Sequence, residues 1–71
     1  MSTAVEAPMP GRIMEILVKV GDQVNYEDEL MILEALKMEN PIYAPSDGRI
    51  AEIKVAVGAT VEAGQVLIVL G

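Results

Sequence analysis

Hydrophobic and polar positions alternate with a period of two along residues 12–20 and again along residues 49–57. This period, combined with many β-branched residues, is typical of a strand that buries one face. In the first stretch we expect Ile16, Val18 and Val20 to lie on the buried face. Short strands are also expected over residues 29–34, 38–43 and 65–70. Because no apolar stripe at helical spacing runs for three turns, the pattern predicts an all-β domain with about eight short strands.

The chain contains an internal repeat with an offset of 37 residues. Residues 7–34 and 44–71 align without a gap and share thirteen identities in 28 positions, where chance would give about two. The expected core positions are unchanged between the copies, whereas the other face has diverged at Leu17 and Lys19. Two copies are too few for a solenoid, so we expect them to be related by a pseudo-two-fold axis within one domain.

Gly21 and its repeat equivalent Gly58 follow the two alternating stretches, and we expect both to break the strands at tight turns. The prediction is therefore one domain over residues 1–71, with copies at 1–34 and 38–71. Its expected fold is a flattened β-barrel or sandwich of two antiparallel sheets that face each other.

Composition narrows the possible functions of this small domain. Hydrophobic residues make up 52% of the 71 residues, and Tyr26 and Tyr43 are the only aromatic residues, so we expect an aliphatic core. A net charge of −6 repels nucleic acids and anionic membranes. Without His or Cys, the chain has no imidazole or thiolate for nucleophilic catalysis or zinc binding, and we expect neither a catalytic nor a metal site. The start of the chain does not resemble a signal peptide, no apolar run is long enough to span a membrane, and the lack of cysteine favours the cytoplasm.

Residues 35–37, Ala-Leu-Lys, join the two copies and have no counterpart in the repeat. If the copies are related by a two-fold axis, this link forms the tip of a hairpin at one pole, and the chain ends lie at the other. Lys37 would then project from the tip, between the apolar side chains of Leu36 and Met38. Exposed apolar residues at one place indicate a docking site for another protein.

At these residues the sequence resembles the biotinyl/lipoyl carrier domains, and among them the biotin carboxyl carrier type. The resemblance covers nearly the whole chain and is carried by Ala7-Pro8-Met9-Pro10-Gly11, Val20-Gly21-Asp22-Gln23-Val24, Glu34-Ala35-Leu36-Lys37-Met38-Glu39-Asn40 and Ala44-Pro45-Ser46-Asp47-Gly48. It implies two four-stranded sheets, with biotin attached covalently to Lys37. It also implies that partner proteins recognise the residues around the lysine, namely Glu34, Ala35, Leu36, Met38 and Glu39.

Two departures from the family pattern refine this interpretation. Leu36 stands where methionine is usual, a change that conserves volume and apolarity. The gapless repeat leaves no room for the protruding thumb of some bacterial acetyl-CoA carboxylase carriers. The chain is therefore most similar to thumbless carriers of propionyl-CoA, pyruvate and related carboxylases, transcarboxylases and decarboxylases.

The resemblance implies a non-catalytic carrier whose partners perform the chemistry. Biotin protein ligase would attach biotin to Lys37, a biotin carboxylase would load the carboxyl group as carboxybiotin, and a carboxyltransferase or decarboxylase would remove it. Two alternatives stay open. One is a lipoyl carrier of an oxidative decarboxylase complex, and the other is an unmodified structural module with the same fold.

Overall fold

The computed structural model describes residues 2–71, and within that range all the regular secondary structure is β-strand. No helix in this part of the chain is long and apolar enough to cross a membrane. The eight strands are β1 (Thr3–Glu6), β2 (Gly11–Ile16), β3 (Gln23–Val24), β4 (Glu29–Ala35), β5 (Met38–Tyr43), β6 (Gly48–Ile53), β7 (Thr60–Val61) and β8 (Val66–Leu70).

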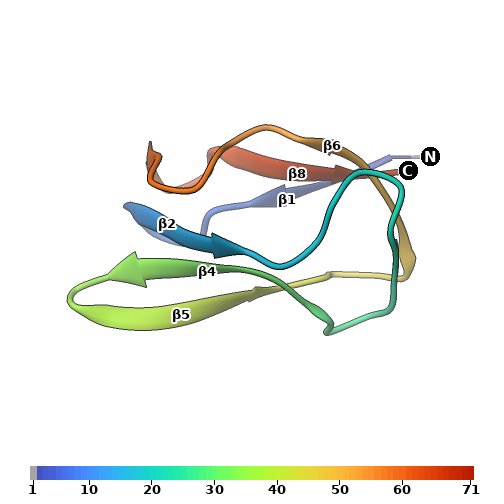
Figure 1. Ribbon diagram of the computed structural model, residues 1–71. Coiled ribbons are helices and arrows are strands. Elements are labelled where there is room, and N and C mark those ends of the chain that lie inside the picture. The colour runs from blue at the N-terminus through green and yellow to red at the C-terminus, as the bar shows by residue number, and fades with distance from the viewer. Residues whose placement is uncertain (1) are drawn as a thin grey trace.

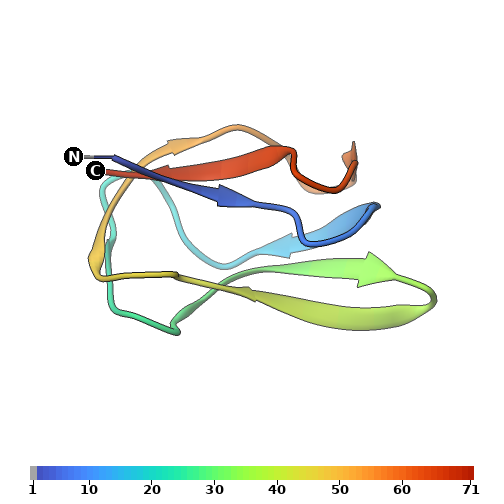
Figure 2. The same cartoon turned by 180° about the vertical axis from the view of Figure 1, so that it is seen from behind.

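The strands form two four-stranded antiparallel sheets, as the sequence predicted. One has the order β1-β8-β6-β3 and the other the order β5-β4-β2-β7. Strand β1 is at the edge of the first sheet and β5 at the edge of the second. The two layers are visible in Figure 1 and, from behind, in Figure 2.

The internal repeat corresponds to a two-fold relation between the sheets. Adding 37 to the residue numbers of β1, β2, β3 and β4 gives those of β5, β6, β7 and β8 to within two residues at the ends. The hydrophobic core obeys the same relation, because its fourteen residues form seven pairs with this offset. The pairs are Val5/Ile42, Ala7/Ala44, Ile13/Ile50, Val24/Val61, Leu30/Leu67, Met31/Ile68 and Leu33/Leu70.

The core face predicted for residues 12–20 is wrong in part. Strand β2 ends at Ile16, and its pairing with β4 shifts register between Ile13 and Glu15, which is a β-bulge. The bulge changes the phase of the alternation between Ile13 and Ile16, so Ile13 is fully buried, although the alternation placed it on the wet face, and Ile16 and Val18 still pack against the core as expected. Val20 lies beyond the end of the strand and is 61% exposed. The second copy repeats this arrangement, with a bulge after Ile50 and with Val57 62% exposed.

The two predicted glycine turns are confirmed. Gly21 and Gly58 have φ angles of 97° and 92°, a left-handed conformation that residues with a Cβ rarely adopt. Each turn is bound to the opposite half of the molecule, because the Gly21 N–H donates to the Ile50 carbonyl and the Gly58 N–H donates to the Ile13 carbonyl. The turns therefore help to hold the two copies together.

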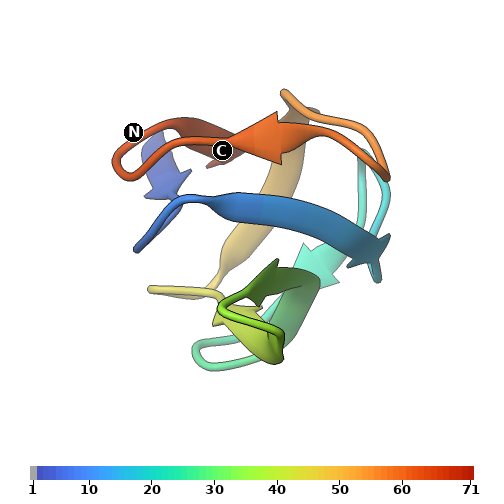
Figure 3. The same ribbon diagram turned by 90° about the vertical axis from the view of Figure 1, so that its left-hand side faces the viewer.

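The molecule is elongated, with extents of 32 × 17 × 17 Å. The turn between β4 and β5 lies at one end of its long dimension, and both chain termini lie at the opposite end (Figures 1 and 2). Figure 3 looks onto the hairpin end, with the β4–β5 turn pointing toward the viewer. This is the arrangement of poles expected from the repeat.

Candidate functional site

The turn at the hairpin end consists of two residues, Leu36 and Lys37. Strands β4 and β5 pair up to Ala35 and Met38, which lie directly opposite each other. The sequence placed the tip at residues 35–37, but Ala35 belongs to β4 and is only 8% exposed. Its side chain lies on the inner face, so Ala35 sets the start of the turn and offers little surface to a partner.

Both turn residues adopt left-handed backbone conformations, with φ angles of 54° for Leu36 and 63° for Lys37. A two-residue hairpin with positive φ at both positions matches a type I′ turn, which strongly favours Asn-Gly. Leucine and lysine in this conformation cost roughly 1–2 kcal/mol each. A left-handed turn without glycine or asparagine is the kind of local strain that concentrates at functional sites.

The side chains around Lys37 are exposed although two of them are apolar. Leu36 is 91% exposed and Met38 is 65% exposed, the two highest values among the large hydrophobic residues described. Lys37 itself is exposed between them. Apolar side chains gathered at a projecting turn lose contact with water only when another molecule covers them.

Two carboxylates and a guanidinium lie one step back from the turn. Glu34 pairs across the hairpin with Glu39, and on its other side Glu34 pairs with Arg12 of β2. Side chains of directly opposed residues lie on the same face of the sheet, so two like charges face each other close to the tip. Opposed like charges destabilise a hairpin, which again indicates that the tip is not optimised for stability alone.

Two residues to which the sequence analysis gave no role of their own, Gly11 and Asn40, support the hairpin. A Cβ at Gly11 would lie 2.4 Å from the Glu34 carbonyl oxygen, so glycine allows β2 to approach β4 beside the tip. The Asn40 side-chain amide donates to the Met38 carbonyl at 3.1 Å and to the Leu33 carbonyl at 3.4 Å, bridging β5 to β4. The repeat identity of Gly11 was a usable signal, and Asn40 lies in a segment that carries the family resemblance, although the sequence did not show that its side chain bridges the strands.

The chemistry available at the tip is that of a primary amine. Among residues 2–71 the one ion pair is between Lys54 Nζ and Glu52 Oε2, at 2.7 Å, so the described structure does not engage Lys37 in a salt bridge. Nor does this part of the chain bring together three His, Cys, Asp or Glu side chains able to hold a metal ion. An exposed amine on a short turn can be acylated by an enzyme that closes over the hairpin.

Comparison with known proteins gives a consistent answer over nearly the whole chain. The family described as "Biotin-requiring enzyme" matches residues 3–70. The chain is 49% identical over 69 residues to the biotin carboxyl carrier protein of Streptococcus mutans, covering 97% of this chain and 53% of that protein. It is 56% identical over 41 residues to the glutaconyl-CoA decarboxylase subunit gamma of Acidaminococcus fermentans, covering 58% of this chain and 28% of that subunit. The chain thus spans about half, or less, of the length of these relatives.

A solved structure shows the same fold. The crystal structure of urea carboxylase from Kluyveromyces lactis superimposes with a TM-score of 0.95 and 30% sequence identity, covering all of this chain and 6% of that one. This solved structure shares the two-sheet fold, and the relatives include a biotin carboxyl carrier protein. Both findings are consistent with a candidate site on the exposed hairpin. The chain belongs to the biotin/lipoyl attachment family, as a carrier domain of the biotin carboxyl carrier type.

Proposed function

We propose that Lys37 is the residue to which biotin is attached, and that the domain carries a carboxyl group on this biotin between enzyme sites. The observation that supports the proposal best is the Leu36-Lys37 turn. It holds a lysine in a strained left-handed conformation at the end of the molecule opposite both termini. A tether at either terminus would leave this end free to reach other proteins.

The turn fits an attached biotin because it offers an exposed primary amine with no neighbouring strand beyond it. In the proposed attachment, biotin's carboxylate attacks the α-phosphate of ATP on a biotin protein ligase, which forms an acyl adenylate and releases pyrophosphate. The Lys37 amine in its neutral form attacks the acyl carbon, the new C–N bond forms, AMP leaves and the amine releases a proton. The lysine loses its charge, and its side chain becomes the base of a long flexible arm.

The surrounding residues serve recognition in this proposal. Leu36 and Met38 give the ligase and the carboxylase components an apolar contact on each side of the lysine. Glu34 and Glu39 add a charge pattern on the outer face of the hairpin, and Arg12 extends it to β2. The rigid hairpin fixes the direction of the amine, so that a partner reads its position along with its neighbours.

Bound biotin supplies a ureido ring that takes up and gives back a carboxyl group. The domain would present this ring first to a biotin carboxylase and then to a carboxyltransferase or decarboxylase subunit. Tethering raises the local concentration at the second site, to the millimolar range for short linkers, without any new contact. We place this cycle in the cytoplasm, in keeping with a chain that contains no cysteine.

The test is an intact-mass measurement on the full chain after incubation with a biotin protein ligase, biotin and ATP. We expect a gain of one biotinyl group for the unaltered chain and for Lys19→Arg and Lys54→Arg. We expect no gain for Lys37→Arg, which keeps the charge but removes the reactive amine. The two control variants leave the turn intact, so they separate a specific site from general lysine acylation.

The same assay distinguishes the alternatives. A lipoyl carrier would gain a lipoyl group from lipoate and a lipoyl ligase, and would not react with the biotin ligase. A purely structural module would gain neither group. A biotinyl gain that persists in Lys37→Arg would contradict the proposed site while leaving the family assignment untouched.

A further inference from the structure

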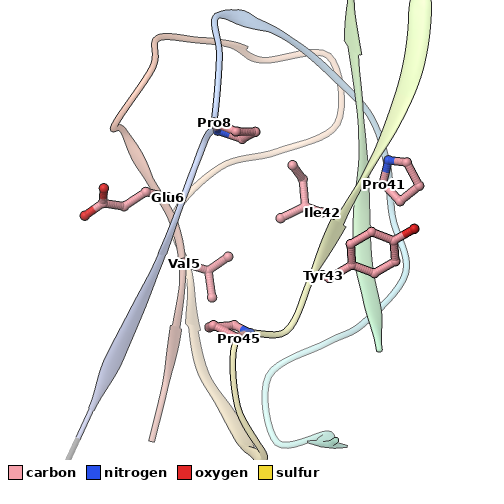
Figure 4. A pocket seen from close by; sticks show the side chains of 7 residues that line it. All are labelled: Val5, Glu6, Pro8, Pro41, Ile42, Tyr43 and Pro45. Atoms are coloured by element: carbon pink, nitrogen blue, oxygen red, sulfur yellow. The ribbon is translucent and has the colours of Figure 1, made fainter. Parts of the chain in front are cut away.

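A groove lies between β1 and β5, away from the Leu36-Lys37 turn. Its volume is about 330 Å³, near the lower limit of the roughly 300–1,000 Å³ typical of ligand pockets. Val5 and Pro8 line it from the side of β1, and Ile42 and Pro45 line it from the side of β5 (Figure 4). These four residues form two pairs of the internal repeat, so the centre of the groove follows the two-fold relation between the copies.

The rim of the groove departs from this symmetry. Glu6 lies on the β1 side, and its repeat equivalent on the β5 side is Tyr43. Pro41 lines the rim beside Tyr43, at the position equivalent to Ala4. Tyr43 is 52% exposed in a protein whose core is entirely aliphatic. An exposed tyrosine beside rigid prolines is typical of protein interfaces, where it adds contact area at low conformational cost.

Charges are distributed unevenly around this groove. Strands β1, β4, β5 and β8 contain four carboxylates and no lysine or arginine; the carboxylates are those of Glu6, Glu29, Glu34 and Glu39. Glu29 pairs directly with Tyr43 and so lies next to the rim. Apart from Lys37, the cations lie on β2 and β6 or just after these strands; they are Arg12, Lys19, Arg49 and Lys54. Glu34 and Glu39 lie close to the hairpin tip, where Glu34 also faces Arg12, so the carboxylates beside the groove are Glu6 and Glu29. With no lysine or arginine on the strands that carry them, these two carboxylates complement a cationic ligand.

From this apolar centre and acidic surround, we infer that the groove between β1 and β5 binds an extended segment of a partner protein with alternating apolar and basic side chains. The apolar side chains pack over Val5 and Ile42 at the floor of the groove, and lysine or arginine side chains reach across the rim to Glu29 and to Glu6, whose side chain points away from the centre of the groove (Figure 4). The groove runs along two edge strands, β1 and β5, which suits an extended peptide. No buried polar residue described in the structure is there to orient a small molecule, which also favours a peptide. A second copy of the chain is disfavoured because two acidic surfaces would face each other.

This inference does not depend on Lys37, because the groove and the turn are separate surfaces. Binding at the groove would leave the hairpin free, so a partner could hold the domain while the arm moves. The groove would then supply a docking contact in addition to the tip residues.

The test is an NMR titration of the isotope-labelled full chain with two capped octapeptides, one alternating leucine with lysine and the other alternating leucine with glutamate. We expect the lysine peptide to shift the amide signals of Val5, Glu6, Ile42 and Tyr43, with weaker binding as salt is raised. The glutamate peptide should leave these signals unchanged.

Variants make the titration specific. Tyr43→Ser should weaken binding of the lysine peptide by at least about fivefold, as expected when a tyrosine contact worth more than 1 kcal/mol is removed. Glu6→Lys should weaken it and reduce its salt dependence. Val57→Ser, at an exposed valine in another turn, should bind as the unaltered chain does.

Four results would overturn the inference. One is equal binding of both peptides, and another is a set of shifts centred on the acidic residues Glu27 and Asp28 instead of the groove. The third is unchanged affinity in Tyr43→Ser. If unlabelled protein alone produced the same shifts, the groove would be a contact between copies and the proposed partner would be wrong.

Discussion

The first repeat (residues 7–34) and the second (residues 44–71) build the same strands around paired core residues, but they differ where each meets the surface. After the first copy the chain continues through the Leu36-Lys37 turn into β5, and within residues 2–71 no equivalent hairpin follows β8. One pole of a nearly symmetric molecule thus carries the candidate attachment site, and the opposite pole carries the termini (Figure 1). The core residues repeat between the copies, whereas the poles differ: one carries the candidate attachment lysine and the other the two ends of the chain.

The two copies also differ in the backbone surroundings of two equivalent pairs of residues. Gly11 is pressed against the Glu34 carbonyl, with 2.4 Å to an ideal Cβ, while the equivalent Gly48 has 3.4 Å to its nearest neighbour, the Gly71 carbonyl. Glu27 adopts a left-handed φ of 70°, while the equivalent Gly64 has a φ of 82°. In each pair, two equivalent positions of the repeat differ, either in their contacts or in their residue type. A substitution at one position can therefore be compared with a substitution at the other.

The largest expected effect comes from moving the amine within the turn. The double variant Leu36→Lys, Lys37→Leu keeps the composition and both left-handed positions but displaces the amine by one residue. Because neighbouring turn positions point in different directions, we expect biotinylation to fall to background while thermal stability stays within about 0.5 kcal/mol. Ligase kinetics and thermal unfolding measure the two parts. Modification at the normal rate would show that the hairpin does not fix the direction of the amine.

Core truncations test how symmetric the interior is. Ile13→Ala and Ile50→Ala each remove a side chain that is at most 1% exposed from equivalent places. We expect each to lower the free energy of unfolding by about 2–5 kcal/mol, with the two values within about 1 kcal/mol of each other. Urea denaturation of both variants gives the comparison. A much larger loss for one of them would mean that the two halves do not share one core equally.

A smaller and asymmetric effect is expected at the paired glycines. Gly11→Ala forces a methyl group against the Glu34 carbonyl of the backbone and should cost about 1–3 kcal/mol. Gly48→Ala meets only ordinary contacts, and we expect a change within about 0.5 kcal/mol. Equal costs for the two variants, measured by chemical denaturation, would contradict a specific close approach of β2 to β4 beside the hairpin.

The smallest effect is expected at the left-handed pair. Glu27→Gly relieves a left-handed conformation that costs roughly 1–2 kcal/mol for a residue with a Cβ, at the expense of greater chain entropy in the unfolded state. A net stabilisation of about 0.5–1 kcal/mol should result, and Gly64→Glu should destabilise by a similar amount. Thermal unfolding measures both. Opposite signs would show that side-chain contacts of Glu27 outweigh its backbone conformation.

Much of the fold was predictable because the sequence is duplicated. The repeat identified the glycine turns and the location of the link, since these depend on patterns shared by two copies. The core face expected from it was right only for Ile16 and Val18, which pack partly buried against the core, and wrong for Val20. The β-bulge at Ile13 was not predictable from the alternation, because a single inserted residue changes the phase of the alternation. Identity between the copies did not indicate burial either, because Ile13 and Ile50 are buried whereas the equally identical Val20 and Val57 are exposed.

The site was predictable in part for the same reason. The unmatched link pointed to Lys37, but its length was overestimated because residue types alone did not show that Ala35 pairs with Met38. The left-handed conformations of Leu36 and Lys37 run against local preference, so no propensity could indicate them. The groove between β1 and β5 depends on how two edge strands approach in space, which a linear pattern does not contain.

The most direct test of the attachment geometry is peptide mapping by tandem mass spectrometry of the biotinylated full chain. The chain has three lysines, Lys19, Lys37 and Lys54, all of them exposed, so exposure alone would allow reaction at each. We predict one biotinyl group per chain, found only on the peptide that contains Lys37. Biotin on Lys19 or Lys54, or spread over all three lysines, would contradict the claim that the hairpin singles out one amine.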